Sequence, residues 1–407
     1  MNKLRVLLVL IIMIGLLVLS SSWTKSASID TLAYVVGLGI DVGENNNLLV
    51  SFQISLPNSV SGESSSQSDS SVINSIECTS IESGLNILNT YISKQVNLSH
   101  CKVIVFSEKL AAQGLSSYLY TLINNVQVRP DCNIIISRCD SAYFLENSKP
   151  VLEKLSAKYY EIAPTSSEYT GYTENLTLND FFYAMNTSIS NPIAILGGVN
   201  TPSSQTTPSA NNVEQDGSYK ANETPIKSDP NIENIGLAIF KDAVLVGELT
   251  GFETVCHLII SNNLNTCTIS IPSPFITGDT IDLRVTQKKK TKRDVKIVNG
   301  SPYITCDIEL EARVISMTGS NEYMNEQNIA RIEEYANSYM HYQIIQYLEK
   351  TARKFGTDID DFGEKVVKNF LFEKDWNKFD WLDNYQNSFF NVNLNTTVVS
   401  GDLLMEN

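Results

Sequence analysis

An unbroken apolar run close to the N-terminus is the feature that most constrains this chain. Lys3 and Arg5 precede it, and the small polar residues 20–22 end it. As a helix rising about 1.5 Å per residue, the run spans about 21 Å, less than a hydrocarbon core of about 30 Å. This length is typical of the apolar part of a signal sequence. The run consists of Val6, Leu7, Leu8, Val9, Leu10, Ile11, Ile12, Met13, Ile14, Gly15, Leu16, Leu17, Val18 and Leu19.

An uncleaved membrane anchor is the second interpretation of this segment. If residues 20–23 continue the helix, it reaches about 27 Å, and Trp23 lies at the interfacial depth that indoles prefer. Cleavage is also compatible with the small residues Ser26 to Ser28. Either way, residues 1–28 form the signal sequence or anchor, and Lys3 and Arg5 predict that the rest of the chain lies on the extracytoplasmic side.

The composition limits what the exported part can be. Hydrophobic residues make up 43% of the chain, as in globular proteins, and the roughly 380 residues after the signal favour two or three domains. The formal net charge is −15, and residues 1–28 contain three basic residues and no acid, so the exported part is more acidic still. Such a charge argues against nucleic-acid binding and against broad electrostatic docking on anionic lipid.

The cysteines do not form a metal or redox motif. Without a C-x-x-C pair, the zinc and thioredoxin-like interpretations lose their main signal. Up to three disulfides are conceivable, with Cys132/Cys139 and Cys256/Cys267 closest in sequence. Cys101, Cys132 and Cys306 lie beside or within strand-like runs, which favours buried free thiols. The seven cysteines are Cys78, Cys101, Cys132, Cys139, Cys256, Cys267 and Cys306.

The hydrophobic pattern of residues 29–196 predicts an N-terminal α/β region. It opens with a β-hairpin, residues 32–41 and 48–56, in which alternation predicts one buried face, and continues through a Ser-rich surface loop at 57–75. A strand-helix-strand unit with two parallel strands follows, and Asp140 is expected to cap a further short helix. The remaining predicted elements are helices at 81–96 and 107–125 and strands at 101–106 and 133–137.

Residues 197–233 separate this region from a C-terminal α+β region, residues 234–407. They are rich in Asn, Ser, Thr and Pro and predict a flexible linker or excursion. Beyond them, a hairpin at 236–249 and a long amphipathic helix at about 324–355 are expected, with Gly356 ending the helix. Further predicted elements are strands at 267–271, 281–287, 295–298, 303–315 and 389–399 and a helix at 361–372 capped by Asp358 or Asp360. The fold class is therefore α+β, a multi-domain arrangement of mixed sheets with packed helices.

Several segments of the chain, taken together in their order and spacing, are typical of one family. They are Trp23, residues 32–41, residues 100–111, the hairpin 236–249, the long helix, residues 358–364, Trp376 and the last strand. In these segments the sequence resembles the Ger(x)C family, the C subunits of spore-germination nutrient receptors, which implies a three-domain germination C-subunit architecture. The resemblance also implies an extracytoplasmic subunit with no assigned enzymatic activity, which works beside two membrane-embedded receptor subunits at the spore inner membrane.

The sequence departs from the family pattern at the usual lipidation site. Family members place a lipid-accepting cysteine directly before the tryptophan, and here Ser22 precedes Trp23. A serine oxygen cannot replace the thioether sulfur, so no lipidation is expected at this site, and the uncleaved anchor gains support. Glu248 also replaces a family-like tryptophan after Gly247.

No motif predicts catalysis, a cofactor or a metal. His100, His257 and His341 lie outside any H-E-x-x-H arrangement and are expected to be structural or exposed. The acidic cluster Asp358, Asp360, Asp361 and Glu364 lacks the spacing of a calcium loop, and helix capping explains it better. G-x-S-x-G, P-loop and G-x-G-x-x-G motifs are also absent from the sequence. The only basic run is Lys288 to Arg293, for which a solvated hairpin tip is favoured over a contact with anionic headgroups.

The sequence therefore predicts a non-enzymatic receptor subunit on the extracytoplasmic face of the membrane. Its expected partners are membrane-embedded germination receptor subunits and the membrane, and not nucleic acid; a small-molecule germinant is not assigned to this subunit. The main alternative is a free-standing exported solute-binding protein with a ligand cleft between its modules. A third hypothesis is an exported hydrolase, which would require a cleft lined by carboxylates with perturbed pKa values.

Overall fold

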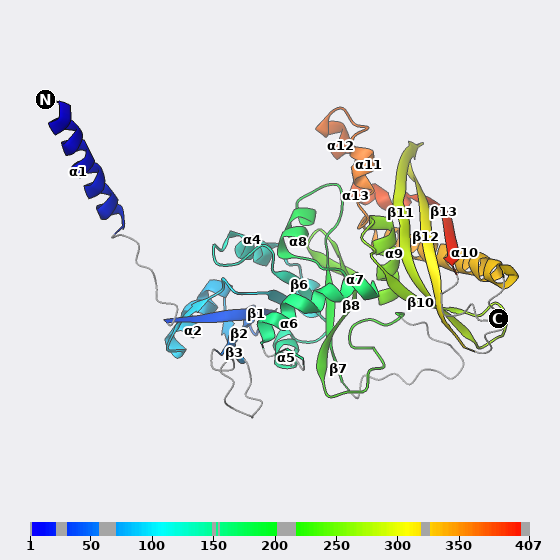
Figure 1. The fold of residues 1–407 in the computed structure, drawn as a ribbon, viewed down its shortest axis with the longest axis horizontal. Coiled ribbons are helices and arrows are strands. Elements are labelled where there is room, and N and C mark those ends of the chain that lie inside the picture. The colour runs from blue at the N-terminus through cyan, green and yellow to red at the C-terminus, as the bar shows by residue number, and fades with distance from the viewer. Residues whose placement is uncertain are drawn as a thin grey trace.

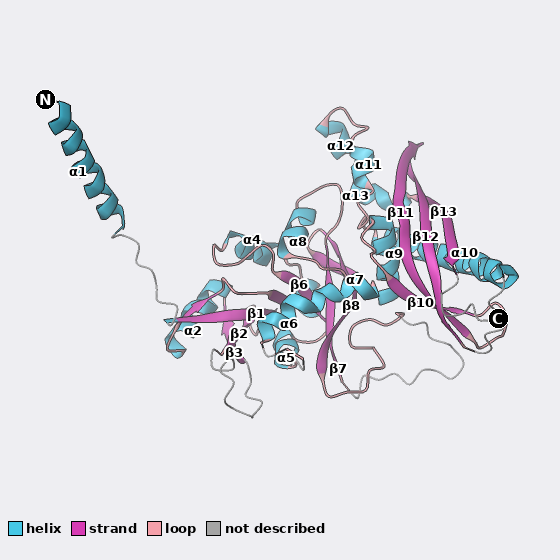
Figure 2. Ribbon diagram, in the orientation of Figure 1, coloured by secondary structure: helices cyan, strands magenta, loops and turns pink. Residues whose placement is uncertain are grey.

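In the computed structural model, two β-sheets with packed helices form the body of the molecule, which confirms the α+β fold class (Figures 1 and 2). Among the described residues, one sheet holds nine strands and the other four, and each combines parallel with antiparallel pairs, which confirms the mixed sheets. The structure describes residues 2–21, 31–56, 71–148, 152–153, 155–201, 217–318 and 326–399.

The N-terminal apolar run is helical. It lies within α1 (Asn2–Ser21), which stands apart from the body of the molecule in Figure 1, and the side chains from Val6 to Ile14 are exposed. Among the described residues, no helix combines the length and apolar character needed to span a membrane. Ser22, Trp23 and residues 26–28 lie outside the described residues, so the expectations about lipidation and cleavage stay predictions.

The nine-stranded sheet is parallel at its centre and antiparallel on both sides. Its path runs β3-β2-β1-β5-β6-β7-β8-β9, and β4 pairs with β1. The pairs β1·β5, β5·β6 and β6·β7 are parallel, so the predicted parallel neighbours at 101–106 and 133–137 are confirmed. The strands are β1 (Leu32–Val42), β2 (Leu48–Ser55), β3 (Ser71–Cys78), β4 (Gln95–Asn97), β5 (Val103–Ser107), β6 (Asn133–Ser137), β7 (Ile193–Asn200), β8 (Asn231–Lys241) and β9 (Val244–Leu249).

Helices cover both faces of this sheet because its central strands are apolar throughout. In β5, Val103 and Val105 face one core, and Ile104 and Phe106 face the other. Parallel strands buried on both faces show such continuous apolar runs. Helices α2, α4 and α8 contribute to the second core, and α5 and α6 contribute to the first. The helices of this part are α2 (Ile81–Tyr91), α3 (Glu108–Ala111), α4 (Ser116–Asn124), α5 (Ser141–Glu146), α6 (Ser156–Ile162), α7 (Ser167–Thr170) and α8 (Leu178–Met185), with a 3₁₀ turn at Ala163–Ser166.

Three local predictions in this part are wrong. The helix expected at 81–96 ends at Tyr91, because residues 95–97 pair with β1 as β4. The helix expected at 107–125 is two short helices separated at Gly114, whose φ of +107° does not fit a right-handed helix. The loop expected at 57–75 already becomes strand β3 at Ser71.

The first hairpin is buried on both faces, although its alternation predicted one. Ser51 and Gln53, on the polar side of β2, are as buried as their apolar neighbours. Gln53 accepts a hydrogen bond from the hydroxyl of Tyr160 and donates one to Ser71, which satisfies its amide inside the protein. Polar residues in a strand therefore do not indicate solvent exposure when a neighbouring element supplies hydrogen-bond partners.

The predicted boundaries of the linker, residues 197–233, overlap with strands at both ends. Residues 197–200 belong to β7 and residues 231–233 belong to β8. The hairpin predicted at 236–249 is confirmed, and Asp242 adopts a φ of +56° at its turn. Both of its strands complete the nine-stranded sheet. Residues 202–216 lie outside the described residues.

The four-stranded sheet is built on a long, bent hairpin with one buried face. Strand β11 runs unbroken through the two strands predicted at 281–287 and 295–298, with register shifts between Gln287 and Lys292. The basic run from Lys288 to Arg293 is therefore within a strand, and its prediction as a hairpin tip is wrong; the turn lies at Asn299 and Gly300. The strands, in spatial order, are β10 (Cys267–Pro272), β11 (Thr280–Val298), β12 (Ser301–Met317) and β13 (Phe389–Val399), the last parallel to β12.

Helices α9 (Gly251–Ser261) and α10 (Glu326–Glu349) pack against this sheet (Figure 1). The predicted amphipathic face is confirmed, because Ile332, Ala336, Met340 and Ile344 of α10 are buried. A π-helical turn (Lys350–Phe355) extends α10, and Gly356 ends it in the left-handed conformation, as predicted. The chain then forms α11 (Gly363–Val367), α12 (Glu373–Phe379) and α13 (Trp381–Asn384), with a 3₁₀ turn at Tyr385–Asn387, in place of the single helix predicted at 361–372.

All seven cysteines are free, and six of them are buried. Burial confirms the interpretation of Cys101, Cys132 and Cys306 as buried thiols, and neither Cys132/Cys139 nor Cys256/Cys267 forms a disulfide. Burial also raises the pKa of Cys267 and Cys306 to about 12, so both thiols stay protonated and behave as small apolar side chains.

Candidate functional site

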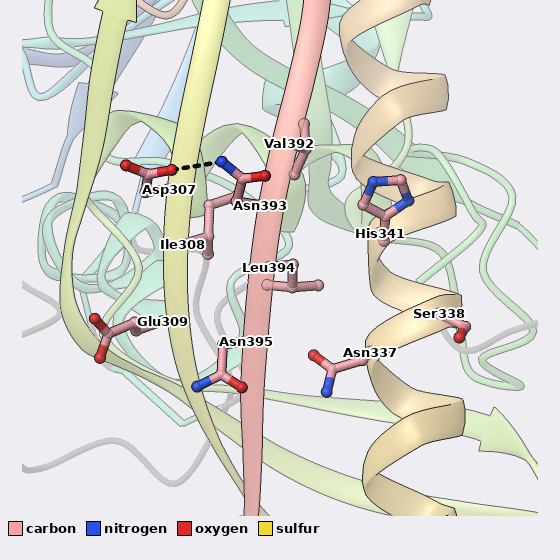
Figure 3. A pocket seen from close by; sticks show the side chains of 10 residues that line it. All are labelled: Asp307, Ile308, Glu309, Asn337, Ser338, His341, Val392, Asn393, Leu394 and Asn395. Carbon is pink, nitrogen blue, oxygen red and sulfur yellow. Dashed lines mark hydrogen bonds between the residues drawn. The ribbon is translucent and has the colours of Figure 1, made fainter.

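A groove of about 630 Å³ lies between helix α10 and the edge strand β13 of the four-stranded sheet (Figure 3). Asn337, Ser338 and His341 line it from the helix, on successive turns of the exposed side. Strand β13 lines it with residues 392–395, and β12 adds residues 307–309. The groove therefore belongs wholly to the C-terminal half of the chain.

Two side chains of α10 bind the outer edge of β13. The Asn337 side chain accepts a hydrogen bond from the Thr396 backbone N–H at 2.7 Å and donates one to the Thr396 carbonyl at 3.4 Å. The Glu333 carboxylate accepts a hydrogen bond from the Val398 N–H at 2.9 Å. At its C-terminal end, the strand edge is thus covered by side chains in place of another strand.

Further backbone groups of β13 are open to the groove. In a parallel ladder, successive residues of an edge strand point their N–H and C=O groups alternately to the neighbouring strand and away from it. Thr396 and Val398 point away from β12, and the pairing of β13 with β12 has no register shift. Val392 and Leu394 therefore also present their backbone groups to the outer edge, which here borders the groove. Such an edge can accept an extended polypeptide by strand addition.

The polar lining of the groove suits hydrogen bonding better than catalysis. Asp307 accepts a hydrogen bond from the Asn393 amide at 2.8 Å (Figure 3). Glu309 forms an ion pair with Lys289 at 2.9 Å. Both carboxylates thus already have partners. Within the described part of the chain, no group of three His, Cys, Asp or Glu side chains is placed to hold a metal ion.

A second unusual feature is a buried ionic centre around His257 of α9. The His257 Nδ1 lies 2.9 Å from an Asp360 carboxylate oxygen, and its Nε2 lies 3.1 Å from a Glu174 carboxylate oxygen. The Tyr347 hydroxyl donates to Asp360 at 2.8 Å. His257, Tyr347 and Asp360 are almost fully buried. Three distant parts of the chain therefore meet at one imidazole.

The two carboxylates keep this imidazole charged. Burial alone lowers the pKa of His257, but the hydrogen bonds to Asp360 and Glu174 outweigh burial and raise the pKa to about 10. Burial and the neighbouring Asp360 charge raise the pKa of Tyr347 well above its ordinary value, so its hydroxyl remains a donor. A histidine that is protonated at neutral pH and bridges two carboxylates joins parts of a fold, and in that state it lacks the free lone pair that a general base or metal ligand needs.

The acidic cluster before α11 has a capping role. The Asp358 carboxylate accepts hydrogen bonds from the backbone N–H groups of Asp360, Phe362 and Gly363 and from the Trp381 indole. Asp358 therefore binds the first backbone N–H groups of α11 from outside the helix, while the N-cap residue itself is Phe362 and not one of the two predicted aspartates. Burial raises the pKa of Asp358 to about 7, although its hydrogen bonds oppose that shift. Asp360, the other candidate cap, contacts His257 instead.

Asp140, predicted to cap the short helix α5, makes no side-chain cap there. Its carboxylate binds Lys109 at 3.0 Å, and the N-terminus of α5 is bound by Asp41 from the first hairpin. Asp41 accepts from the backbone N–H groups of Ser141 and Ala142. The cap thus comes from a residue about one hundred positions away, which no local pattern could indicate.

The structure separates the three histidines. His100 is exposed beside the ring of Tyr34, His341 lines the groove, and His257 lies in the buried centre. Glu174 was not identified from the sequence, because it is 83 positions from His257 and belongs to no motif. The free edge at Val392 and Leu394 was also missed, although the last strand itself was predicted.

Comparisons with known proteins cover most of the chain. The family model described as "Spore germination protein N-terminal domain" matches residues 25–197, and the one described as "Spore germination B3/GerAC like, C-terminal" matches residues 235–401. Two relatives from Bacillus subtilis (strain 168) are similar over nearly their whole length. Spore germination protein KC is 22% identical over 92% of this chain and 89% of its own, and putative spore germination protein YfkR is 23% identical over 95% and 94%.

One solved structure shares the fold. The crystal structure of the GerBC protein superposes with a TM-score of 0.53 and covers 89% of this chain and 97% of GerBC. The sequence identity is 16%, so this likeness concerns the arrangement of the elements alone.

Proposed function

Because this chain belongs to the Ger(x)C family of spore germination proteins, we propose that it is the non-enzymatic, extracytoplasmic subunit of a nutrient (germinant) receptor. The observation that carries the proposal is the match of both halves of the chain, in order, to the two germination domains. The likeness extends over nearly the full length of the two germination proteins of Bacillus subtilis.

In this proposal, the N-terminal segment keeps the subunit at the outer face of the spore inner membrane. Ser22 stands where the family places its lipid-accepting cysteine, so attachment depends on the apolar run from Val6 to Leu19 or on partner subunits. The subunit acts with membrane-embedded receptor subunits, and it performs no bond-making chemistry of its own.

The groove between α10 and β13 is the proposed contact for a partner subunit. An extended segment of the partner would pair with the backbone groups of Val392 and Leu394, and the amides of Asn337 and Asn393 would border it. Main-chain hydrogen bonds require neither a metal ion nor a free pair of carboxylates. This kind of binding therefore agrees with the lining of the groove, whose described residues provide neither.

Purification from the native spore membrane tests the receptor assignment. The tagged full chain is expected in the membrane fraction, together with polytopic germination subunits that mass spectrometry identifies, and its gene deletion should remove the response to some nutrients. Recovery in the soluble fraction with a solute permease would instead support the solute-binding alternative. Intact mass would show whether residues 1–28 are retained.

A matched pair of variants tests the groove. Leu394→Pro removes the N–H that faces the groove and leaves the hydrogen bonds of β13 to β12 in place, whereas Leu394→Ala keeps that N–H. Co-purification of the partner should fall at least about tenfold for Leu394→Pro, as expected for lost main-chain pairing worth about 1.4 kcal/mol, and much less for Leu394→Ala. Equal retention by both variants would exclude strand addition at this edge.

A further inference from the structure

Two large apolar side chains are exposed side by side at the turn between α11 and α12. Leu371 is 92% exposed and Phe372 is 69% exposed. The turn lies at the end of a projection that α11, α12 and α13 form beyond the sheets, drawn in orange in Figure 1. We call residues 368–374 the α11–α12 tip. Apolar groups gathered at a projecting point are typical of a contact surface.

The base of the projection is packed against the body of the molecule. Phe370, directly before Leu371, packs edge-on against Trp376 with ring centroids 5.5 Å apart. The Trp376 indole donates to the Ser188 hydroxyl at 2.7 Å, which attaches the projection to the loop before β7. Leu371 and Phe372 thus point away from an aromatic cluster that lies one residue from them.

Four lysines precede and follow the apolar pair in the sequence. Lys368, Lys374 and Lys378 are exposed and Lys365 is half-buried. The nearby lysines Lys241 and Lys350 form ion pairs, with Asp383 and Glu253, but among the described residues none is recorded for the four lysines of this segment. Residues 364–378 hold these four lysines and three acids, Glu364, Glu373 and Asp375, in a chain of net charge −15, and the acids Asp380 and Asp383 follow towards the base of the projection.

This combination fits the surface of a bilayer better than any other partner. Exposed Leu and Phe side chains enter the boundary between headgroups and acyl chains, while lysine side chains extend to anionic headgroups. The strongly negative charge of the whole chain opposes broad docking on such lipids, which makes a local point of contact the feasible geometry.

We propose that the α11–α12 tip is a second membrane contact, with Leu371 and Phe372 inserted at the bilayer interface. The inference rests on the proposed function, because the N-terminal segment must first bring the chain to the membrane. A single weak insertion does not hold a protein on a bilayer, but a second contact added to an anchor fixes the orientation of the body. The tip would thereby set which surfaces face the membrane subunits.

Quenching by brominated phospholipid tests the contact in the full-length chain. The probe is a Leu371→Trp variant in a Trp23→Phe background, reconstituted into vesicles of phosphatidylcholine and phosphatidylglycerol. The matched control is Tyr91→Trp in the same background, because Tyr91 is 80% exposed on α2, in the other half of the chain. The native Trp376 and Trp381 are buried and contribute equally to both samples.

Quenching should be several-fold stronger for the tryptophan at 371 than for the one at 91. Adding Lys368→Glu and Lys374→Glu should reduce it in these anionic vesicles, because like charges then repel the tip from the headgroups. Equal quenching at 371 and 91 in vesicle-bound protein would overturn the tip contact and leave the membrane attachment standing. Protein that does not associate with vesicles would contradict both. Protection of residue 371 only in native membranes would assign the tip to a protein partner and overturn bilayer insertion.

Discussion

At the scale of single residues, His257 is the most consequential side chain of the fold. Each ring nitrogen of His257 forms a hydrogen bond with a carboxylate, one from Glu174 and one from Asp360, and these contacts raise the pKa of His257 to about 10. Removing one member of a buried ion pair leaves the others without compensation and costs about 3 to 5 kcal/mol. The imidazole therefore stabilises the junction of three chain segments.

Stability should fall as the pH rises, because the folded protein holds protons that the unfolded chain releases. The pKa of His257 is raised from 6.5 to about 10, so its contribution is complete below pH 6.5 and is lost as the pH approaches 10. The pKa of Asp358 is raised from 3.8 to about 7, which acts in the same direction. With both groups included, urea unfolding should show a free energy of unfolding lower by about 4 kcal/mol at about pH 8.5 than at about pH 6.

The His257→Gln variant identifies the group responsible. It should lose about 3 to 5 kcal/mol at about pH 6 and show a weaker pH dependence, whereas His100→Gln, at an exposed histidine, should change stability by less than about 0.5 kcal/mol. An unchanged pH dependence in His257→Gln would contradict the assignment of the protonated imidazole as the main titrating group.

At the scale of elements, the hairpin β8·β9 depends on Gly236 of β8, whose backbone lies directly against that of β9. Gly236 has a φ of +90°, and a Cβ at this position would lie 2.2 Å from the carbonyl oxygen of Leu249. The backbone there cannot move away without breaking the pairing of β8 with β7 or β9. Any side chain at this position therefore strains the edge of the large sheet.

Gly236→Ala should destabilise the protein by more than about 2 kcal/mol, since backbone strain and a steric clash add. Gly278 is the matched control, because its φ is +98° but no atom lies within 4 Å of the added Cβ. Gly278→Ala should cost only about 1 kcal/mol, the conformational part alone. Urea midpoints of the two variants give the comparison, and similar losses would show that the close approach to Leu249 is unimportant.

At the scale of the whole molecule, the two family domains do not coincide with the two sheets. The second family model begins at residue 235, yet the nine-stranded sheet continues through β9 to Leu249. The hairpin β8·β9 thus belongs by sequence to one domain and by hydrogen bonding to the sheet of the other. The contact of His257 with Glu174 and the hydrogen bond from Trp376 to Ser188 add further links across this division.

A fragment that ends at residue 249 should therefore be more stable than one that ends at residue 230. The shorter fragment leaves the edge of β7 without β8, and unpaired strand edges promote aggregation. Circular dichroism during urea titration should give a higher midpoint for the longer fragment, and light scattering should detect more aggregation in the shorter one. Identical behaviour would mean that β8 and β9 are dispensable to the first sheet.

Local patterns in the sequence were sufficient for most of the elements. The hairpin at residues 32–55, the parallel pair β5·β6, the amphipathic helix α10 with its end at Gly356 and the existence of the last strand all follow from hydrophobic period and capping residues. The order of these elements also led to the family. Such features depend on residues within a few positions of each other, where steric preference and side-chain direction act directly.

Only the tertiary structure decided the contacts between residues that are distant in the chain. Asp41 binds the start of α5, Glu174 meets His257, and Lys288 to Arg293 continue a strand because β12 supplies the neighbouring backbone. The edge groups of Val392 and Leu394 became a candidate site because α10 covers only the end of β13. The sequence alone determined most of the local elements, the family and the acidic character of the chain. Packing determined which polar groups are buried, paired or left open, because those contacts exist only once the segments have come together.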